Sequence, residues 1–286
     1  MSARLYRGSY DCRAPARARA LQRWMRGVLP LVVVALLWEL APRSGLVDPV
    51  LLPPLSRTLA AGVALVRSGA LLGHLWASLW RVGAGYLLAV AVAVPAGIGL
   101  GLSRRLEGYV SPVLALLRPI APPAWVPLAI LWFGIGDAPA IFIVFVGTIQ
   151  AVLLGVASAA RSLDRRLVQA ALTLGASRRQ ALWLVALPCL APAILGQLRV
   201  GLALAWMCVM AAEMVAVRRG LGYLLIEARN LFQTERVLLC MLVIGALGLG
   251  LDCLLRGLEG KLLRWQRGLG ADELLAPGSG DQDLSR

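Results

Sequence analysis

The sequence predicts an all-α integral membrane protein with six transmembrane helices. The chain has 286 residues, 59% of them hydrophobic, and a mean hydropathy of +0.76, whereas soluble domains are about 45–50% apolar. Its apolar residues gather in runs of about 20, the length of a helix that crosses a bilayer. The runs lack the alternation over about ten residues that marks a membrane β-barrel.

The first apolar run, at about 24–41, follows a strongly basic segment that holds seven arginines up to position 26. This arrangement resembles a secretory signal. However, the Ala-Pro-Arg sequence at 41–43 is a poor cleavage site. We therefore predict an uncleaved first transmembrane helix at 24–41, behind a basic tail at 1–23.

Five further spans follow, and the third is broken by prolines, which do not fit a helix interior. We place these spans at about 80–102, 109–132, 139–159, 190–212 and 237–256. The segment 42–71 contains a Pro-Pro pair, which predicts an extended piece followed by a short surface helix. The tail from 259 to 286 would follow a transmembrane domain at 72–258.

The arginines predict the orientation of the spans. Of the 29 lysines and arginines, 19 fall on the side that holds both termini and seven on the opposite side. Because basic residues concentrate in cytoplasmic loops, both termini are predicted to be cytoplasmic. The net charge of +14 is explained in the same way, and we favour this explanation over nucleic-acid binding.

The loop between the fourth and fifth spans has the sequence signals of two short helices. Asp164 can cap a helix from 165 to 174, and Gly175 stands where a left-handed helix end belongs. Ser177 and Gln180 match an S-x-x-Q capping box. A second helix should then run until Pro188 stops it.

Ala170 and Ala171 give one face of the first loop helix small side chains only. A bent pair of helices with such a narrow face could insert into a cleft of another protein. A basic helix of this kind could equally rest on lipid headgroups. The residues alone leave both interpretations open.

The same loop resembles the coupling loop of bacterial ABC importer permeases, which has the pattern E-A-A, three residues, G, nine residues, I-x-L-P. The matching residues here are Gln169, Ala170, Ala171, Gly175, Val185, Leu187 and Pro188. Two positions depart from the pattern, with Gln for Glu and Val for Ile. Gln169 can form a hydrogen bond but not the ion pair that the family carboxylate makes with the ATPase.

The resemblance covers about 36–265 and is greatest to the nitrate/sulfonate/taurine/bicarbonate branch, above all to aliphatic sulfonate permeases. Its stretches include SLWRVGAGY at 78–86 and GLGYLLIEARN at 220–230. The resemblance implies a type I ABC importer permease fold that moves a small anion across the inner membrane by alternating access. An aliphatic sulfonate is the favoured anion, with nitrate, taurine or bicarbonate as alternatives.

The resemblance also implies partners: a second permease copy, two ATP-binding cassette subunits, a periplasmic substrate-binding protein and membrane lipid. The location would be a bacterial inner membrane. ATP would be bound by the cassette subunits, because this chain has no G-x-x-x-x-G-K-[ST] motif and its sole lysine, Lys261, follows no glycine loop. We expect no cofactor, metal site or catalytic residue in this chain.

Two other classes are less favoured. An intramembrane enzyme would need a catalytic set, and only His74 with Ser78 suggests one; a lone histidine at the outer end of a span is more often interfacial. A proton-coupled transporter normally has carboxylates inside its spans. Here Glu39 and Glu213 stand only at span ends.

Arg118 and Arg199 fall within predicted spans, where a charge costs roughly 2.5–3.5 kcal/mol on insertion scales. They could line a path for an anion. We favour a structural role, in which the arginines satisfy freed carbonyls or extend to the membrane surface.

Overall fold

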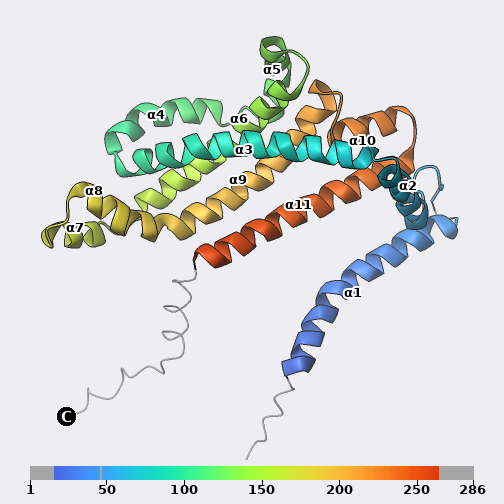
Figure 1. Ribbon diagram of the computed structural model, residues 1–286, viewed down its shortest axis with the longest axis horizontal. Coiled ribbons are helices and arrows are strands. Elements are labelled where there is room, and N and C mark those ends of the chain that lie inside the picture. The colour runs from blue at the N-terminus through green and yellow to red at the C-terminus, as the bar shows by residue number, and fades with distance from the viewer. Residues whose placement is uncertain (1–15, 46, 264–286) are drawn as a thin grey trace, which may run out of the picture. The chain divides into compact units, whose positions relative to one another are not determined.

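The structure is a computed structural model and describes residues 16–45 and 47–263. Every regular element in these residues is helical (Figure 1). The chain divides into two compact units, residues 1–63 and 64–286. Most of the predicted terminal tails, 1–23 and 259–286, lies outside the described residues.

The first unit contains α1 (Ala16–Arg43), and α2 (Leu55–Arg67) begins in it. Glu39 near the end of α1 accepts hydrogen bonds from the N–H and the hydroxyl of Ser56, at 3.0 and 2.9 Å. The indole of Trp38 donates to the carbonyl oxygen of Pro53 at 3.1 Å. These bonds hold the segment between the two helices. Much of it forms turns, in which the N–H groups of Leu51 and Leu52 bond to the carbonyl oxygen of Asp48, so the predicted extended piece is wrong, whereas α2 confirms the predicted short helix.

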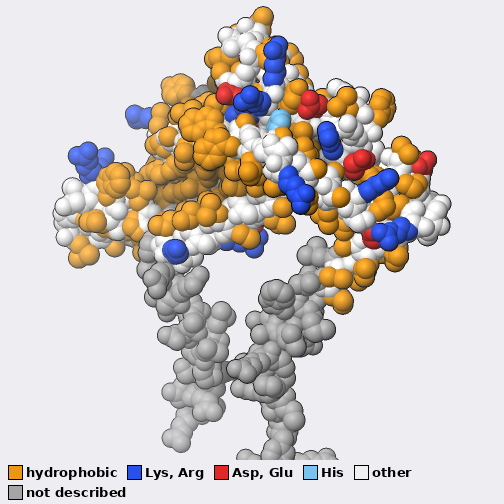
Figure 2. Space-filling view, turned by 45° about the vertical axis from the view of Figure 1, so that its right-hand side comes forward, with side chains coloured by type: hydrophobic (Ala, Val, Ile, Leu, Met, Phe, Trp, Pro, Cys, Tyr) orange, Lys and Arg blue, Asp and Glu red, His pale blue; other side chains and the backbone are white. Residues whose placement is uncertain are grey.

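The second unit is a helical bundle. Its helices are α3 (Ala70–Leu102), α4 (Arg104–Leu117), η1 (Pro122–Trp125), α5 (Val126–Phe133), α6 (Asp137–Arg161), α7 (Arg165–Thr173), α8 (Arg178–Ala181), η2 (Leu182–Ala186), α9 (Leu187–Ala216), α10 (Leu221–Asn230) and α11 (Thr234–Leu262). The long helices α3, α6 and α9 pack together, and α11 packs on α9 and α10. On the face in Figure 2, hydrophobic side chains cover much of the surface, as expected for a bundle surrounded by lipid.

A stripe of small residues explains why α3 lies so close to α6. Every fourth position along one face of α3 is glycine or alanine, at Gly85, Ala89, Ala93, Gly97 and Gly101. A Cβ at Gly97 would lie 2.9 Å from the carbonyl oxygen of Leu153, and a Cβ at Gly101 would overlap Ala160. Small residues let helix backbones approach closely in membranes, where dispersion contacts drive packing.

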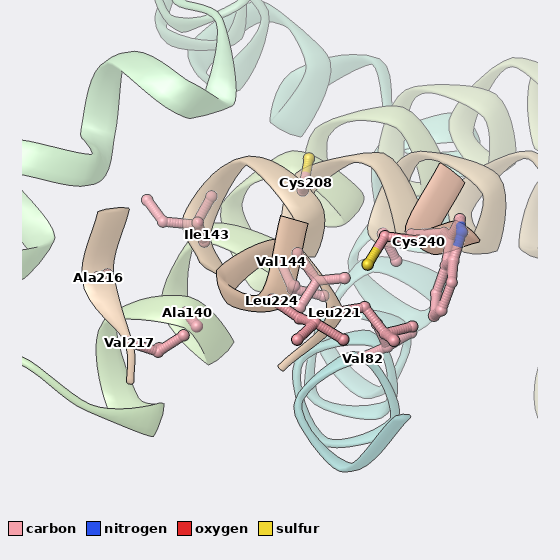
Figure 3. Close-up of a cluster of buried hydrophobic side chains, with 14 of the residues drawn as sticks. Val82, Ala140, Ile143, Val144, Cys208, Ala216, Val217, Leu221, Leu224 and Cys240 are labelled. Carbon is pink, nitrogen blue, oxygen red and sulfur yellow. The ribbon is translucent and has the colours of Figure 1, made fainter. Parts of the chain in front are cut away.

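The buried core lies where α3, α6, α9 and α10 meet (Figure 3). Ile143, Val144, Val209 and Leu221 are completely buried there. The indole N–H of Trp206 reaches across to α11 and donates to the carbonyl oxygen of Ile244 at 3.2 Å. This core fixes the ends of several helices relative to one another.

Four helices of the described part are long and apolar enough to cross a membrane: α3, α6, the continuous helix Arg178–Ala216, and α11. The predicted third span consists of α4 and of η1 with α5, bent by 83° at the proline-rich break, and counts as a fifth if it is one broken span. α1 covers the predicted first span. The number six therefore stays a prediction that the helices accommodate.

The predicted stop at Pro188 is wrong. α8, η2 and α9 form one continuous helical segment through this proline. The turn before it is a π-helix, in which the N–H of Leu187 bonds to the carbonyl oxygen of Leu182. This wider turn shifts the hydrogen-bond pattern just where proline supplies no N–H, so the helix continues at little cost.

Candidate functional site

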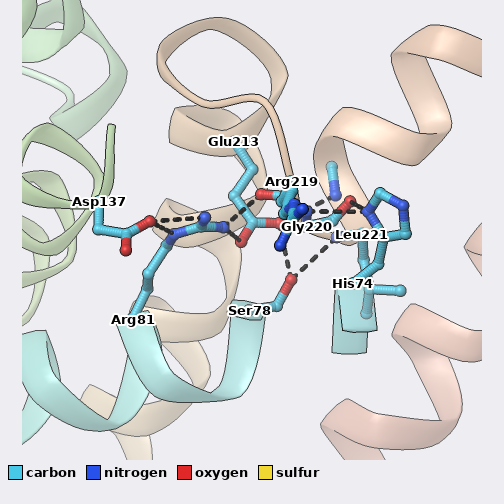
Figure 4. A network of polar contacts seen from close by, with 9 residues as sticks. His74, Ser78, Arg81, Asp137, Glu213, Arg219, Gly220 and Leu221 are labelled. Carbon is cyan, nitrogen blue, oxygen red and sulfur yellow. Dashed lines mark hydrogen bonds and ion pairs between the residues drawn. The ribbon is translucent and has the colours of Figure 1, made fainter. Parts of the chain in front are cut away.

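Two polar sites lie at opposite ends of the bundle. The α7–α8 loop follows the last residue of α6 and leads into α9. A network of polar and charged side chains joins the N-terminal half of α3 and the first residue of α6 to the last turn of α9, at the other end (Figures 1 and 4). If the predicted topology holds, the loop faces the cytoplasm and the network faces outward.

Arg81 on α3 is the centre of this network. Its Nη1 lies 2.5 Å from Oε1 of Glu213 at the end of α9. Its Nε and Nη2 lie 2.8 and 2.7 Å from Oδ1 of Asp137, the first residue of α6. Nη1 also donates to the carbonyl oxygen of Arg219 at 2.6 Å. One guanidinium thus ties α3 to the start of α6, the end of α9 and the turn after α9.

The second oxygen of Glu213 is fully engaged as well. Oε2 accepts hydrogen bonds from the hydroxyl of Ser78 at 2.8 Å and from the N–H of Gly222 at 3.0 Å. The Ser78 hydroxyl in turn accepts from the N–H of Leu221 at 2.9 Å. Because Glu213 is completely buried, these partners supply the compensation that a buried carboxylate requires.

Gly220 joins the network to His74. Its backbone has a φ of +133°, which side chains rarely adopt, and a Cβ there would overlap the Glu213 carboxylate. Nδ1 of His74 lies 3.0 Å from both the N–H and the carbonyl oxygen of Gly220, so it bonds to this residue in either tautomer. His74 and Ser78 therefore bind different backbone groups of the same turn. They do not form the dyad that an intramembrane hydrolase would need.

A cavity of about 450 Å³ opens beside the network, lined in part by Arg81, Asp137, Arg218 and Arg219. The Asp137 side chain is 59% exposed, whereas that of Arg81 is 4% exposed. Arg218 and Arg219 are exposed. Among the described residues, no group of three or more His, Cys, Asp or Glu could hold a metal ion.

At the other end, the local signals of the loop are confirmed. The Asp164 carboxylate accepts a hydrogen bond from the N–H of Arg166 at 2.9 Å and caps α7. Gly175 has a φ of +90° and forms the predicted left-handed bend. Ser177 and Gln180 make both hydrogen bonds of a capping box, at 3.3 and 2.8 Å.

The loop residues of the predicted pattern differ in exposure. Gln169, Ala170, Gly175 and Pro188 are exposed, and Ala171, Val185 and Leu187 are half-buried. Three large apolar side chains beside them are also exposed: Leu174 by 89%, Trp183 by 64% and Leu184 by 72%. The bent loop thus presents a mixed apolar and basic surface at the end of the bundle.

The structure distinguishes the two arginines predicted within spans. Arg199 on α9 pairs with Asp252 on α11, and Asp252 also pairs with Arg256 at 2.8 Å. This supports the structural interpretation for Arg199. Arg118 is exposed at the break between α4 and η1, and its N–H bonds to the carbonyl oxygen of Leu114.

Three features of the structure are not predicted from the sequence. Asp252 is a carboxylate inside the last span, and α10 is a further helix between the last two spans. The third feature is the network itself, in which Arg81 contacts Asp137, 56 positions away, and Glu213, 132 positions away. The sequence offered one signal for this contact: an arginine lies near the start of one predicted span, and acidic residues lie at the ends of two others.

Comparisons with known proteins agree with this fold. A sequence profile described as "Binding-protein-dependent transport system inner membrane component" matches residues 85–264. The permease of the methionine ABC transporter MetNI, solved in inward-facing form, superimposes with a TM-score of 0.57 at 20% identity, covering 68% of this chain and 94% of that one. At that identity the likeness concerns the fold, which is of the type I importer kind.

Two relatives are similar over most of their length. The taurine transport system permease protein of Escherichia coli is 35% identical over 82% of this chain and 87% of its own. A putative aliphatic sulfonates transport permease of Bacillus subtilis is 32% identical over 85% of this chain and 88% of its own. The chain therefore belongs to the family of binding-protein-dependent transport system inner membrane components and is an ABC transporter permease.

Proposed function

We propose that the chain is the membrane-spanning subunit of an ATP-driven importer for a small anion, with an aliphatic sulfonate as the favoured substrate. The exposed loop formed by α7, Gly175 and α8 carries this proposal, because it is a stiff bent element at one end of the bundle. The names of the taurine and sulfonate relatives support the choice of anion.

In the proposed mechanism, the loop sits in a groove of a separate ATPase subunit. Each short helix has its own N-terminal cap, so the loop can transmit a displacement without unfolding. The loop is also continuous with α9 through the π-turn. When the ATPases close around ATP, movement of the loop would pass directly into α9 and change which side of the membrane is open.

A homodimer follows from the same proposal. One chain offers one such loop, and a motor of two ATPases needs two. A two-fold axis between the permease copies would then run along the pathway. A periplasmic substrate-binding protein would deliver the anion to the outer end.

Reconstitution into proteoliposomes with the ATPase and the binding protein tests the proposal. We expect ATP-dependent uptake of radiolabelled taurine or ethanesulfonate, reduced by an excess of the unlabelled compound. Unlabelled nitrate and bicarbonate serve as competitors that identify the alternative substrates. Uptake that persists without the ATPase, or no ATP-dependent uptake of any of these anions, would contradict the proposed function.

A further inference from the structure

The cavity beside the Arg81 network lies at the end of the bundle that the predicted topology places outside the cytoplasm. Its lining carries charges that are not fully balanced within the network. Arg81 and Glu213 form a buried pair and cancel each other. Asp137 then adds one negative charge, and Arg218 and Arg219 add two positive charges at the cavity lining. A rim with both signs of charge favours a ligand that also carries both.

The geometry of Asp137 leaves one oxygen available. Both contacts with Arg81 end on Oδ1, at 2.7 and 2.8 Å. Figure 4 shows the second oxygen pointing away from these contacts. The side chain is 59% exposed, so Oδ2 can accept a hydrogen bond from a ligand while Oδ1 stays on the buried arginine.

Arg218 and Arg219 provide the opposite charge. They follow one another between α9 and α10, where the buried Val217 and Gly220 bracket them. The carbonyl oxygen of Arg219 is held by Arg81, which fixes this turn against the network. Guanidinium groups match the oxygens of carboxylates and sulfonates and form charge-assisted hydrogen bonds with them.

The size of the cavity limits the ligand. About 450 Å³ lies at the small end of the range for ligand pockets, roughly 300–1,000 Å³. A compound with two or three carbons between its charged groups fits this volume, and Arg218, Arg219 and Asp137 all line it.

We propose that this cavity binds a small zwitterion, an amino-sulfonate in preference to a plain alkanesulfonate, with its anionic group on Arg218 and Arg219 and its ammonium on Asp137. The inference rests on the proposed function for the anion and narrows the substrate class. The site would give the permease its own selectivity, separate from that of the binding protein.

The test is direct binding to the full permease with its ATPase in lipid nanodiscs, without the binding protein. Radiolabelled taurine, which carries a sulfonate and an ammonium, should bind saturably at millimolar concentration. Unlabelled ethanesulfonate lacks the ammonium and should compete about tenfold more weakly, as expected for the loss of one charge-assisted bond. Ethanolamine lacks the anion and should compete still less.

Three variants and a control connect binding to the residues. Arg218→Gln and Arg219→Gln should each weaken taurine binding about tenfold. Asp137→Asn keeps an acceptor for Arg81 but should remove the preference for taurine over ethanesulfonate. Arg229→Gln is the matched control, because Arg229 is exposed on α10 and bonds to Asn230. It should bind taurine normally, and thermal unfolding of each variant should show that the bundle is intact.

Equal binding of taurine and ethanesulfonate by the unaltered protein, no saturable taurine binding, or a preference that survives Asp137→Asn would overturn the inference. In each case ATP-dependent anion uptake in proteoliposomes would leave the proposed function standing. Failure of that uptake in the unaltered protein is a separate outcome and would contradict the transport function itself.

Discussion

Glu213 on the last turn of α9 holds Arg81 on α3 by a buried ion pair of 2.5 Å. The two residues are 132 positions apart, so the pair joins two helices at one end of the bundle. A buried ion pair adds only modestly to the stability of the protein, because both charges must leave water. Removing one partner alone is strongly destabilising. Loss of Arg81 leaves the buried Glu213 carboxylate without a counter-charge, whereas loss of Glu213 leaves Arg81 paired with Asp137 alone.

We expect Glu213→Ala to destabilise the protein by about 2–3 kcal/mol, below the full cost of an unpaired buried charge, because Arg81 keeps Asp137 while Ser78 and Gly222 lose their acceptor. Glu213→Gln should cost less, because the amide keeps hydrogen bonds to Ser78 and Arg81. The thermal unfolding midpoint of the purified protein measures both. Glu227→Ala is the control, since Glu227 is exposed on α10, and it should unfold like the unaltered protein. An equal effect of all three substitutions would exclude the anchoring role.

Gly220→Ala should be damaging for two reasons. The φ of +133° disfavours any side chain, and the added Cβ would overlap the Glu213 carboxylate. Together we expect a loss of at least about 2 kcal/mol in the free energy of unfolding. Gly250→Ala on α11 meets no atom within 4 Å and should be neutral or slightly stabilising. Equal stability of the two variants would show that the turn tolerates a side chain.

The pair between Arg199 and Asp252 should behave as one unit in the membrane. Asp252→Leu leaves two arginines without their carboxylate, and Arg199→Leu leaves Asp252 with Arg256 alone. Either single change should lower the unfolding midpoint. The double variant should recover part of the loss, because neither charge of the pair is then left in the bundle. If the two losses simply add, the pair is not coupled.

Local signals made the loop predictable. A cap, a left-handed glycine and a capping box act over three or four residues, so Asp164, Gly175, Ser177 and Gln180 could be identified from the sequence. The continuation of the helix through Pro188 was not predictable, because no local sequence signal marks the π-turn at Leu182–Ala186 that precedes it. The long apolar runs were likewise predictable, since their length alone matches the bilayer.

The network was not predictable in the same way. Ser78, Arg81, Asp137 and Glu213 come from three helices, and each contact depends on how these helices pack. Their closeness depends in part on Gly85, one turn after Arg81 in the stripe of small residues on α3, where a Cβ would lie 2.7 Å from the side chain of Val144 on α6. The stripe of small residues can be recognised in the sequence, but the sequence does not show that α6 is the helix that packs against it.

The predicted topology can be tested by fusing alkaline phosphatase after Arg67 and, separately, after Arg178. The enzyme is active only outside the cytoplasm, so the first fusion should be active and the second inactive. The reason is the excess of arginines on the side of the termini and the α7–α8 loop. Activity at Arg178, or none at Arg67, would reverse or break the assigned orientation, and with it the outward placement of the Arg81 network.

The last prediction concerns the coupling role of the loop. Gly175→Val puts a β-branched side chain at a φ of +90°, which costs roughly 1–2 kcal/mol. No atom lies within 4 Å of the added Cβ, so the effect should be confined to the bend. The variant should reach the membrane but lose ATPase binding or uncouple ATP hydrolysis from transport.

Two further variants separate docking on the ATPase from docking on lipid. Ala171→Arg should block ATPase binding by its bulk, and Gln169→Glu should preserve or strengthen it by restoring the family carboxylate. A loop that rests on anionic lipid predicts the reverse order, because added arginine favours and added glutamate opposes contact with the headgroups. The amount of ATPase recovered in a pull-down with each variant distinguishes docking on the ATPase from docking on lipid. Normal recovery with Ala171→Arg and loss with Gln169→Glu would rule out the coupling role.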